Sequence, residues 1–395
     1  MVRQASLQSD LESIAGADSV WTDSEDYAVD GVLPKAAVLP PSAEATAEII
    51  RYANTESLAV IPLGGCLHVG RGNLPARYDI GIDMTTLTGI GAYEPEDLTL
   101  TCQAGTTLGE LRRATAAAGQ MVGFDPEIPD WATVGGVLAA DVWGPSRLSL
   151  GAPRDFTIGL RVITGDGLMT RAGGRVVKNV AGYDLCKLYV GSLGTLAVIT
   201  EATFKVQPLP KATQGASYTF VSATQACRVA NAALMAGLSL RSAVVTRDDG
   251  GWVLRMGLAG TTAAVERSAV EIAALAGGRD RGQETGDRPR SEGGVIAVRV
   301  STLPSRLPAL LEGLPAGVDC EAYPTLGVVR ARLRDNEHLT SMLALGGLIE
   351  SAPAEVKRDV DVFGAEPSSL ALMRKLKAEF DPNGVLSPGR FVGQL

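Results

Sequence analysis

Histidine and cysteine are scarce in this sequence of 395 residues. It has two histidines, His68 and His338, and its five cysteines, at positions 66, 102, 186, 227 and 320, contain no C-x-x-C motif. So few histidines leave little room for a histidine-built metal centre, and the cysteine spacing matches neither an iron–sulfur nor a zinc site. Scattered cysteines in odd number favour reduced thiols over a disulfide framework. We expect no metal site.

Positive charge and long apolar runs are also lacking. The formal net charge is −8, and no dense Lys/Arg patch is present, which argues against a nucleic-acid partner. No apolar run is long enough to cross a bilayer. The first residues, M-V-R-Q-A-S-L-Q-S-D, lack the apolar core of a signal peptide. We therefore expect a cytoplasmic protein.

What is present is typical of an α/β enzyme of two or three domains: 46% hydrophobic residues, 20% charged residues and 46 glycines. A short β-branched run leads into residues 61–72, I-P-L-G-G-C-L-H-V-G-R-G. Glycines after a strand let a ligand approach the backbone amides, as a phosphate or pyrophosphate would. The loop matches neither G-x-G-x-x-G nor G-x-x-x-x-G-K-[ST], so neither a Rossmann nor a Walker site is implied.

Local signals predict the order of elements. Ser42 and Thr107 are expected to cap helices, and residues 156–163 and 168–171 are expected to form a hairpin across T-G-D-G. Residues 132–140, A-T-V-G-G-V-L-A-A, combine small residues with helical spacing, which permits close approach either of another helix or of a ligand. After Pro208-Leu-Pro210, the order β-α-β-β-α occurs twice, which predicts an antiparallel sheet backed by helices.

Four segments together resemble the PCMH-type FAD-binding family (vanillyl-alcohol oxidase/p-cresol methylhydroxylase), with the closest likeness to the FAD-binding subunit of bacterial glycolate oxidase. They are residues 61–72, 132–154, 173–203 and 380–390, and the run V-K-N-V-A-G-Y-D-L followed by G-S-L-G-T-L-A-V-I-T-E is the most specific. The resemblance implies an α+β protein: a PCMH-type FAD-binding domain of two α/β subdomains and a cap domain with an antiparallel sheet. We expect an N-terminal segment (1–33), the FAD domain (34–210), the cap (211–360) and a C-terminal helix and tail (361–395) that returns to the FAD domain.

Carried over onto this sequence, the family's cofactor contacts imply three groups of FAD-binding residues. They are Pro62, Leu63, Gly64, Gly65, Cys66, Leu67 and His68; then Ala132, Thr133, Val134, Gly135, Gly136 and Ala139; and finally Gly194, Val198 and Ile199. The first group would present amides to the pyrophosphate, and small residues would lie near the flat flavin ring. Non-covalent FAD is expected; a shifted alignment would place Cys66 where some relatives attach FAD. Lys178 and Asn179 are either flavin contacts or parts of a solvated loop.

The first loop departs from the family's common P-R-G-G-G-T-K at Leu63, Cys66, Leu67 and His68, and Asp141 adds a carboxylate to the second segment. No catalytic residue is nominated, because residues 211–360 contain one histidine, His338. Tyr323 and Arg330 could bind a carboxylate, but any antiparallel sheet presents such residues.

The resemblance implies an FAD-binding oxidoreductase subunit of a glycolate oxidase-type complex, acting on a small 2-hydroxy acid of the glycolate or D-lactate class. Its partners would be a catalytic flavoprotein subunit and an iron–sulfur subunit, which would bring the chain to the inner face of the membrane if the complex feeds a respiratory chain. Two alternatives stay open: a self-sufficient FAD-linked 2-hydroxy-acid dehydrogenase, and a structural subunit that kept the fold and lost the cofactor.

Overall fold

The computed structural model describes residues 2–22, 25–125, 127–175, 183–248, 250–277, 279–280, 296–315 and 317–395. The chain divides into two compact units. Unit 1 consists of Met1–Val142, Ala152–Pro208 and Lys357–Leu395, and unit 2 of Trp143–Gly151 and Leu209–Val356. Among the described residues, no helix is both long and apolar enough to cross a membrane.

Unit 1 opens with a small sheet in the order β1-β2-β4-β3, in which β2, β4 and β3 run parallel and β1 is antiparallel to β2. Ser42 accepts a hydrogen bond from Ala45 N and begins the helix between β2 and β3, as the sequence predicts. The helices and strands are α1 (Val2–Ala15), β1 (Val20–Trp21), β2 (Ala36–Val38), α2 (Ala43–Glu56), β3 (Val60–Leu63) and β4 (Ile80–Asp83), with short 3-10 helices at Ala17–Ser19, Glu25–Tyr27 and Met84–Thr86.

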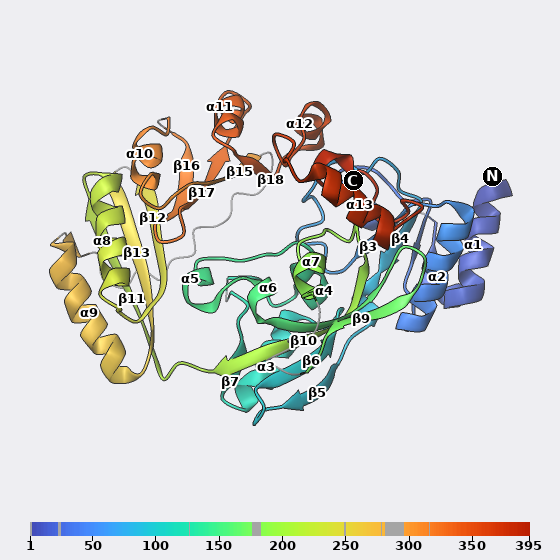
Figure 1. Cartoon of the computed structure of the whole chain (residues 1–395), viewed down its shortest axis with the longest axis horizontal. Helices are drawn as coiled ribbons and strands as arrows, with labels where there is room; N and C mark the ends of the chain where they lie inside the picture. The colour runs from blue at the N-terminus through green and yellow to red at the C-terminus, as the bar shows by residue number, and fades with distance from the viewer. Residues whose placement is uncertain are drawn as a thin grey trace. The chain divides into compact units, whose positions relative to one another are not determined.

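A second, antiparallel sheet of unit 1 follows the order β5-β6-β10-β8-β9, with β7 paired to β10 (Figure 1). The predicted hairpin is confirmed as β8 and β9. The strands are β5 (Ile90–Glu94), β6 (Thr99–Gln103), β7 (Gln120–Val122), β8 (Thr157–Ile163), β9 (Met169–Gly173) and β10 (Val198–Pro208); the helices are α3 (Leu108–Ala117), α4 (Val134–Ala139), α6 (Pro153–Phe156), α7 (Cys186–Tyr189) and, in the tail, α13 (Leu370–Phe380), with a 3-10 turn at Val392–Gln394.

The hydrophobic core of this second sheet fixes the helices on which the candidate site depends. Phe124 packs edge-on against Phe156 and Phe204, with ring centroids 5.0 and 5.3 Å apart. Val134 and Leu138 from α4 are fully buried in the same cluster, so the short helix is held by packing on one side. Thr107 begins α3 with the predicted cap, a reciprocal capping box with Glu110.

Unit 2 is built on one antiparallel sheet, in the order β14-β11-β13-β12-β16-β17-β15-β18. Helices α8 and α9 pack against β11, β12 and β13 (Figure 1), which confirms the predicted antiparallel sheet backed by helices. The elements are α5 (Arg147–Leu150), β11 (Ala212–Phe220), α8 (Ala223–Met235), β12 (Leu240–Asp248), β13 (Gly251–Gly260), α9 (Thr262–Ala276), β14 (Arg279–Asp280), β15 (Ile296–Ser301), α10 (Leu307–Glu312), β16 (Asp319–Tyr323), β17 (Val328–Leu333), α11 (Leu339–Ala344), β18 (Leu348–Ser351) and α12 (Ala354–Asp359), which runs into unit 1.

Candidate functional site: a cleft between three glycine-containing segments

Three segments far apart in the sequence meet around a cleft in unit 1. The empty space between them is about 900 Å³, including the part open to solvent. The cleft is lined by Ile61, Pro62, Leu63, Gly64, Gly65, Cys66, Leu67, His68, Val69, Met84, Ala104, Ala132, Thr133, Gly135, Gly136, Val137, Ala139, Ala140, Leu193, Gly194, Ala197, Val198, Ile199 and Arg390. Most of these side chains are small or apolar, as a site for a flat aromatic group requires.

The glycine loop leaves β3 at Leu63 and turns sharply at Cys66, whose φ is 53°. Gly65 N donates to Thr133 Oγ1 at 3.3 Å. Within the described chain, the backbone N–H groups of Gly64, Cys66 and Leu67 have no acceptor. Successive amides around a left-handed residue form a concave anion site, so the loop fits a pyrophosphate.

Glycine is required where this loop meets α4. A Cβ on Gly64 would lie 2.2 Å from Thr133 Oγ1, and a Cβ on Gly135 would lie 2.9 Å from the Cβ of Ala104. Both distances are too short for real atoms, so a larger residue at Gly64 would push the loop away from the start of α4, and one at Gly135 would push α4 away from the segment that follows β6. The close approach foreseen for the small residues therefore occurs, and the same helix lines the cleft.

The third segment closes the cleft through a left-handed glycine. Gly194 has φ +70°, and a Cβ on it would lie 2.7 Å from Pro62 Cγ. The segment is tied to the end of α4 by two backbone hydrogen bonds, from Gly191 N to Leu138 O and from Leu193 N to Ala139 O, each 2.9 Å long. Packing and hydrogen bonding together hold all three segments in one arrangement.

Every predicted cofactor residue except Val134 lines this cleft. The Val134 side chain is fully buried in the core, and its backbone amide donates to Thr106 O. Neither the side chain nor the amide is therefore available to a ligand. Asp141 is not among the lining residues, so its carboxylate does not border the cleft. Lys178 and Asn179 lie outside the described residues.

The described lining of the cleft includes a positively charged side chain but no carboxylate. Its described lining contains no Asp or Glu, and Arg390 is its single Arg or Lys. Sequence reasoning singled out the tail, residues 380–390, without assigning Arg390 a role. The resemblance of the tail to the family predicts that the tail returns to the FAD domain. It does not predict which side chain of the tail lines the cleft.

The Cys66 thiol lies at the cleft, and the residue is exposed. Partial burial raises the pKa of the Cys66 thiol, and the nearby Asp83 carboxylate acts in the same direction. A thiol that stays protonated is a poor nucleophile, which favours non-covalent cofactor binding over a thioether. Among the described residues, no three His, Cys, Asp or Glu side chains gather in an arrangement that could hold a metal ion.

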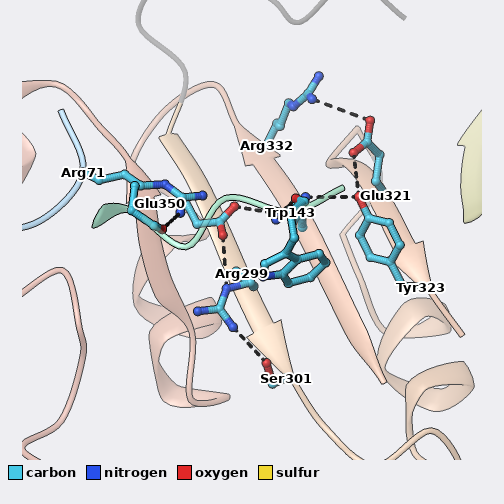
Figure 2. Close-up of polar contacts among 10 residues, drawn as sticks. Arg71, Trp143, Arg299, Ser301, Glu321, Tyr323, Arg332 and Glu350 are labelled. Atoms are coloured by element: carbon cyan, nitrogen blue, oxygen red, sulfur yellow. Dashed lines mark hydrogen bonds and ion pairs between the residues drawn. The ribbon is translucent and has the colours of Figure 1, made fainter. Parts of the chain in front are cut away.

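In unit 2, Tyr323, Glu321 and Arg332 are joined by polar contacts on the sheet (Figure 2). Arg330 lies on β17 opposite Glu321. Arg330 lies 2.9 Å from Glu350, donates to the Trp143 carbonyl at 3.0 Å and stacks 4.1 Å from the Trp143 ring. Glu350 also pairs with Arg299 at 3.1 Å. The guanidinium of Arg330 is thus already ion-paired with Glu350 within unit 2, which argues against a role in substrate binding.

Comparison with known proteins identifies the domain that carries the cleft. Residues 34–173 match the family described as FAD binding domain, and residues 364–391 match the C-terminal domain of FAD linked oxidases. The glycolate oxidase subunit GlcE of Escherichia coli is 46% identical over 132 residues, 33% of this chain and 38% of that protein. The glycolate oxidase subunit GlcD of Bacillus subtilis is 31% identical over 179 residues, 45% of this chain and 38% of that protein. The matches therefore span well under half the length of these curated relatives.

The solved structure of p-cresol methylhydroxylase with substrate bound superposes with a TM-score of 0.75 over 98% of this chain and 96% of that one. Its 16% identity shows a shared fold and no more. This confirms the predicted α+β, PCMH-type architecture. The chain therefore has the fold of p-cresol methylhydroxylase and contains an FAD binding domain and, in its tail, a match to the C-terminal domain of FAD linked oxidases, and these matched domains indicate FAD as the cofactor.

Proposed function

We propose that this chain is the FAD-binding oxidoreductase subunit of a glycolate oxidase-type complex, which oxidises a small 2-hydroxy acid of the glycolate or D-lactate class. The observation that carries the proposal is the 132-residue segment that is 46% identical to a glycolate oxidase subunit. The cleft supports it, because the matched FAD-binding domain includes both the glycine loop and α4.

In this proposal FAD lies in the cleft without a covalent link. The amides of Gly64, Cys66 and Leu67 face the pyrophosphate, and Gly135 and Gly136 keep the backbone of α4 close to the cofactor. Oxidising a 2-hydroxy acid to a 2-oxo acid removes two electrons and two protons, and a bound flavin supplies the group that takes up the electrons. The chain's own part is to bind the cofactor, orient it and exclude water with the apolar lining.

Substrate activation is assigned to a partner subunit. A 2-hydroxy acid needs a general base at its hydroxyl or α-carbon. The only histidine in the sequence of unit 2 is His338, which lies at the N-terminus of α11. Arg330 is already paired with Glu350. We therefore expect a catalytic flavoprotein subunit to carry the acid–base chemistry and an iron–sulfur subunit to receive the electrons.

Native purification of the tagged chain tests this assignment. We expect two further subunits to co-purify, one yellow and one with iron–sulfur absorption, and we expect the complex to oxidise glycolate or D-lactate with an artificial electron acceptor. The chain purified alone and loaded with FAD should be inactive towards the same acids. An isolated chain that turns over these acids at the rate of the complex would contradict the accessory role and establish a self-sufficient dehydrogenase.

A further inference from the structure

One wall of the cleft is a tight turn with an unusual residue in it. The turn runs from Ser192 to Thr195, whose N–H donates to Ser192 O at 3.0 Å. Its two central residues, Leu193 and Gly194, are both left-handed, with φ of 54° and 70°. Positive φ at both central positions is the type I′ conformation, in which asparagine followed by glycine is the preferred sequence. A leucine at the first central position is therefore unexpected.

The backbone of Leu193 is strained in this turn. The left-handed conformation brings the Cβ of an L-residue close to the following carbonyl oxygen, and only glycine, asparagine and aspartate adopt it routinely. The Leu193 N–H donates to Ala139 O at 2.9 Å, which helps to keep the residue there. Strained residues of this kind cluster at ligand-binding sites. The strain is explained if the leucine side chain has a use that an asparagine side chain would lack.

The Leu193 side chain lies at the cleft. It is half-buried and belongs to the lining. Its Cδ1 lies 2.9 Å from the position that a Cβ on Gly72 would take, at the end of the glycine loop. The side chain therefore reaches from the turn towards the loop and leaves part of its apolar surface exposed at the cleft. Covering such a surface with an apolar ligand is favourable.

A second leucine has the same backbone strain with a different explanation. Leu98 has φ 55° and is also half-buried, but it does not line the cleft. Its side chain packs against the hydrophobic core of the second sheet, a cluster to which Leu193 does not belong. Core packing thus holds Leu98 in place, whereas Leu193 has an apolar surface that is available to a ligand.

We propose that Leu193 is a cofactor-packing residue, whose side chain lies against a flat ring of FAD. Gly194, Ala197 and Val198 follow it in the lining, so small and apolar side chains surround the place where a planar ring would lie. Isoalloxazine and adenine share this chemistry, and ligands that carry only one of the two rings distinguish them. The inference rests on the proposed placement of FAD in the cleft, and not on the substrate or on partner subunits.

Three ligands report on the two rings separately. Riboflavin carries isoalloxazine without phosphate or adenine, ADP carries adenine and the pyrophosphate, and FAD carries all of these groups. Isothermal titration calorimetry measures their affinities for the wild-type apoprotein and for Leu193→Asn. This substitution keeps the backbone hydrogen bond to Ala139 O and gives the turn its preferred Asn-Gly sequence, so we expect the variant to fold.

We expect Leu193→Asn to bind FAD about 3-fold to 30-fold more weakly, because the cofactor no longer covers part of a leucine side chain. Either riboflavin or ADP, but not both, should weaken by the same factor. A loss for riboflavin places isoalloxazine against Leu193, and a loss for ADP places adenine there.

Two further variants separate packing on the ligand from shaping of the cleft. Leu98→Asn makes the same exchange at nearly the same φ but away from the cleft, and it should leave all three affinities unchanged. Leu193→Met keeps an apolar side chain of similar volume and should retain most of the affinity for FAD.

The proposal would be overturned by unchanged FAD affinity in Leu193→Asn, by an equal loss for riboflavin and ADP, or by an equal loss in Leu193→Met. If Leu193→Asn does not fold, Leu193→Gly replaces it, because glycine adopts the left-handed conformation without strain. These affinities require neither partner subunits nor turnover. A chain that fails to co-purify with partners would therefore contradict the proposed function and leave the role of Leu193 standing.

Discussion

Gly194→Ala is the perturbation that tests most sharply how the cleft is closed. The residue has φ +70°, which costs an L-residue about 1–2 kcal/mol. Its new Cβ would also lie 2.7 Å from Pro62 Cγ, and relieving such an overlap in a well-packed region costs about 1–3 kcal/mol. We therefore expect the free energy of unfolding to fall by about 2–5 kcal/mol.

Gly119→Ala separates these two contributions. Gly119 has nearly the same backbone conformation, φ +67°, but a Cβ there meets no atom within 4 Å. Urea denaturation of both variants, followed by far-UV circular dichroism, should show a loss of about 1–2 kcal/mol for Gly119→Ala and a clearly larger loss for Gly194→Ala. Equal losses would show that Gly194 is needed only for its backbone conformation and that the third segment does not press against Pro62.

Three further outcomes are expected. Cys66 should react with iodoacetamide more slowly than free cysteine at pH 8, because its raised pKa leaves less thiolate; the rate should rise with pH, and saturating FAD should suppress it, whereas equal rates with and without FAD would place the cofactor elsewhere. Thr107→Ala removes the cap of α3 and should lower the free energy of unfolding in urea by about 0.5–2 kcal/mol; an unchanged free energy would show that the cap does not stabilise the helix. Trp143→Leu removes the ring stacked on Arg330 and should lower unit 2 stability by at least about 1 kcal/mol; an unchanged unfolding transition would refute a structural role for this contact.

Features set by local chemistry could be predicted from the sequence. Ser42 and Thr107 begin helices because their side-chain oxygens satisfy free amides within three residues. The hairpin of β8 and β9 follows from a glycine-containing turn between two apolar runs. The glycines of the cofactor segments could also be predicted, because backbones that approach each other closely require residues without a side chain.

Features set by distant contacts could not be predicted in the same way. Val134 has the apolar character of its neighbours in the cleft segment, and only the packing of α4 on the Phe124 cluster decides that it points away from the ligand. Arg390 is an ordinary surface-type residue in the sequence, and its burial depends on Asp30 and the loop carbonyls. The sequence does not predict the strand β18, because its four residues show no clear alternation of apolar and polar side chains.

The visible spectrum of the purified chain, recorded before and after acid precipitation, tests the central claim most directly. Non-covalent FAD in the cleft predicts a yellow protein with flavin absorption near one flavin per chain, and a colourless precipitate with all flavin in the supernatant. Flavin that stays with the precipitate would contradict the inert Cys66 thiol and the non-covalent site. A colourless chain that cannot be reconstituted with FAD would contradict the cofactor assignment itself.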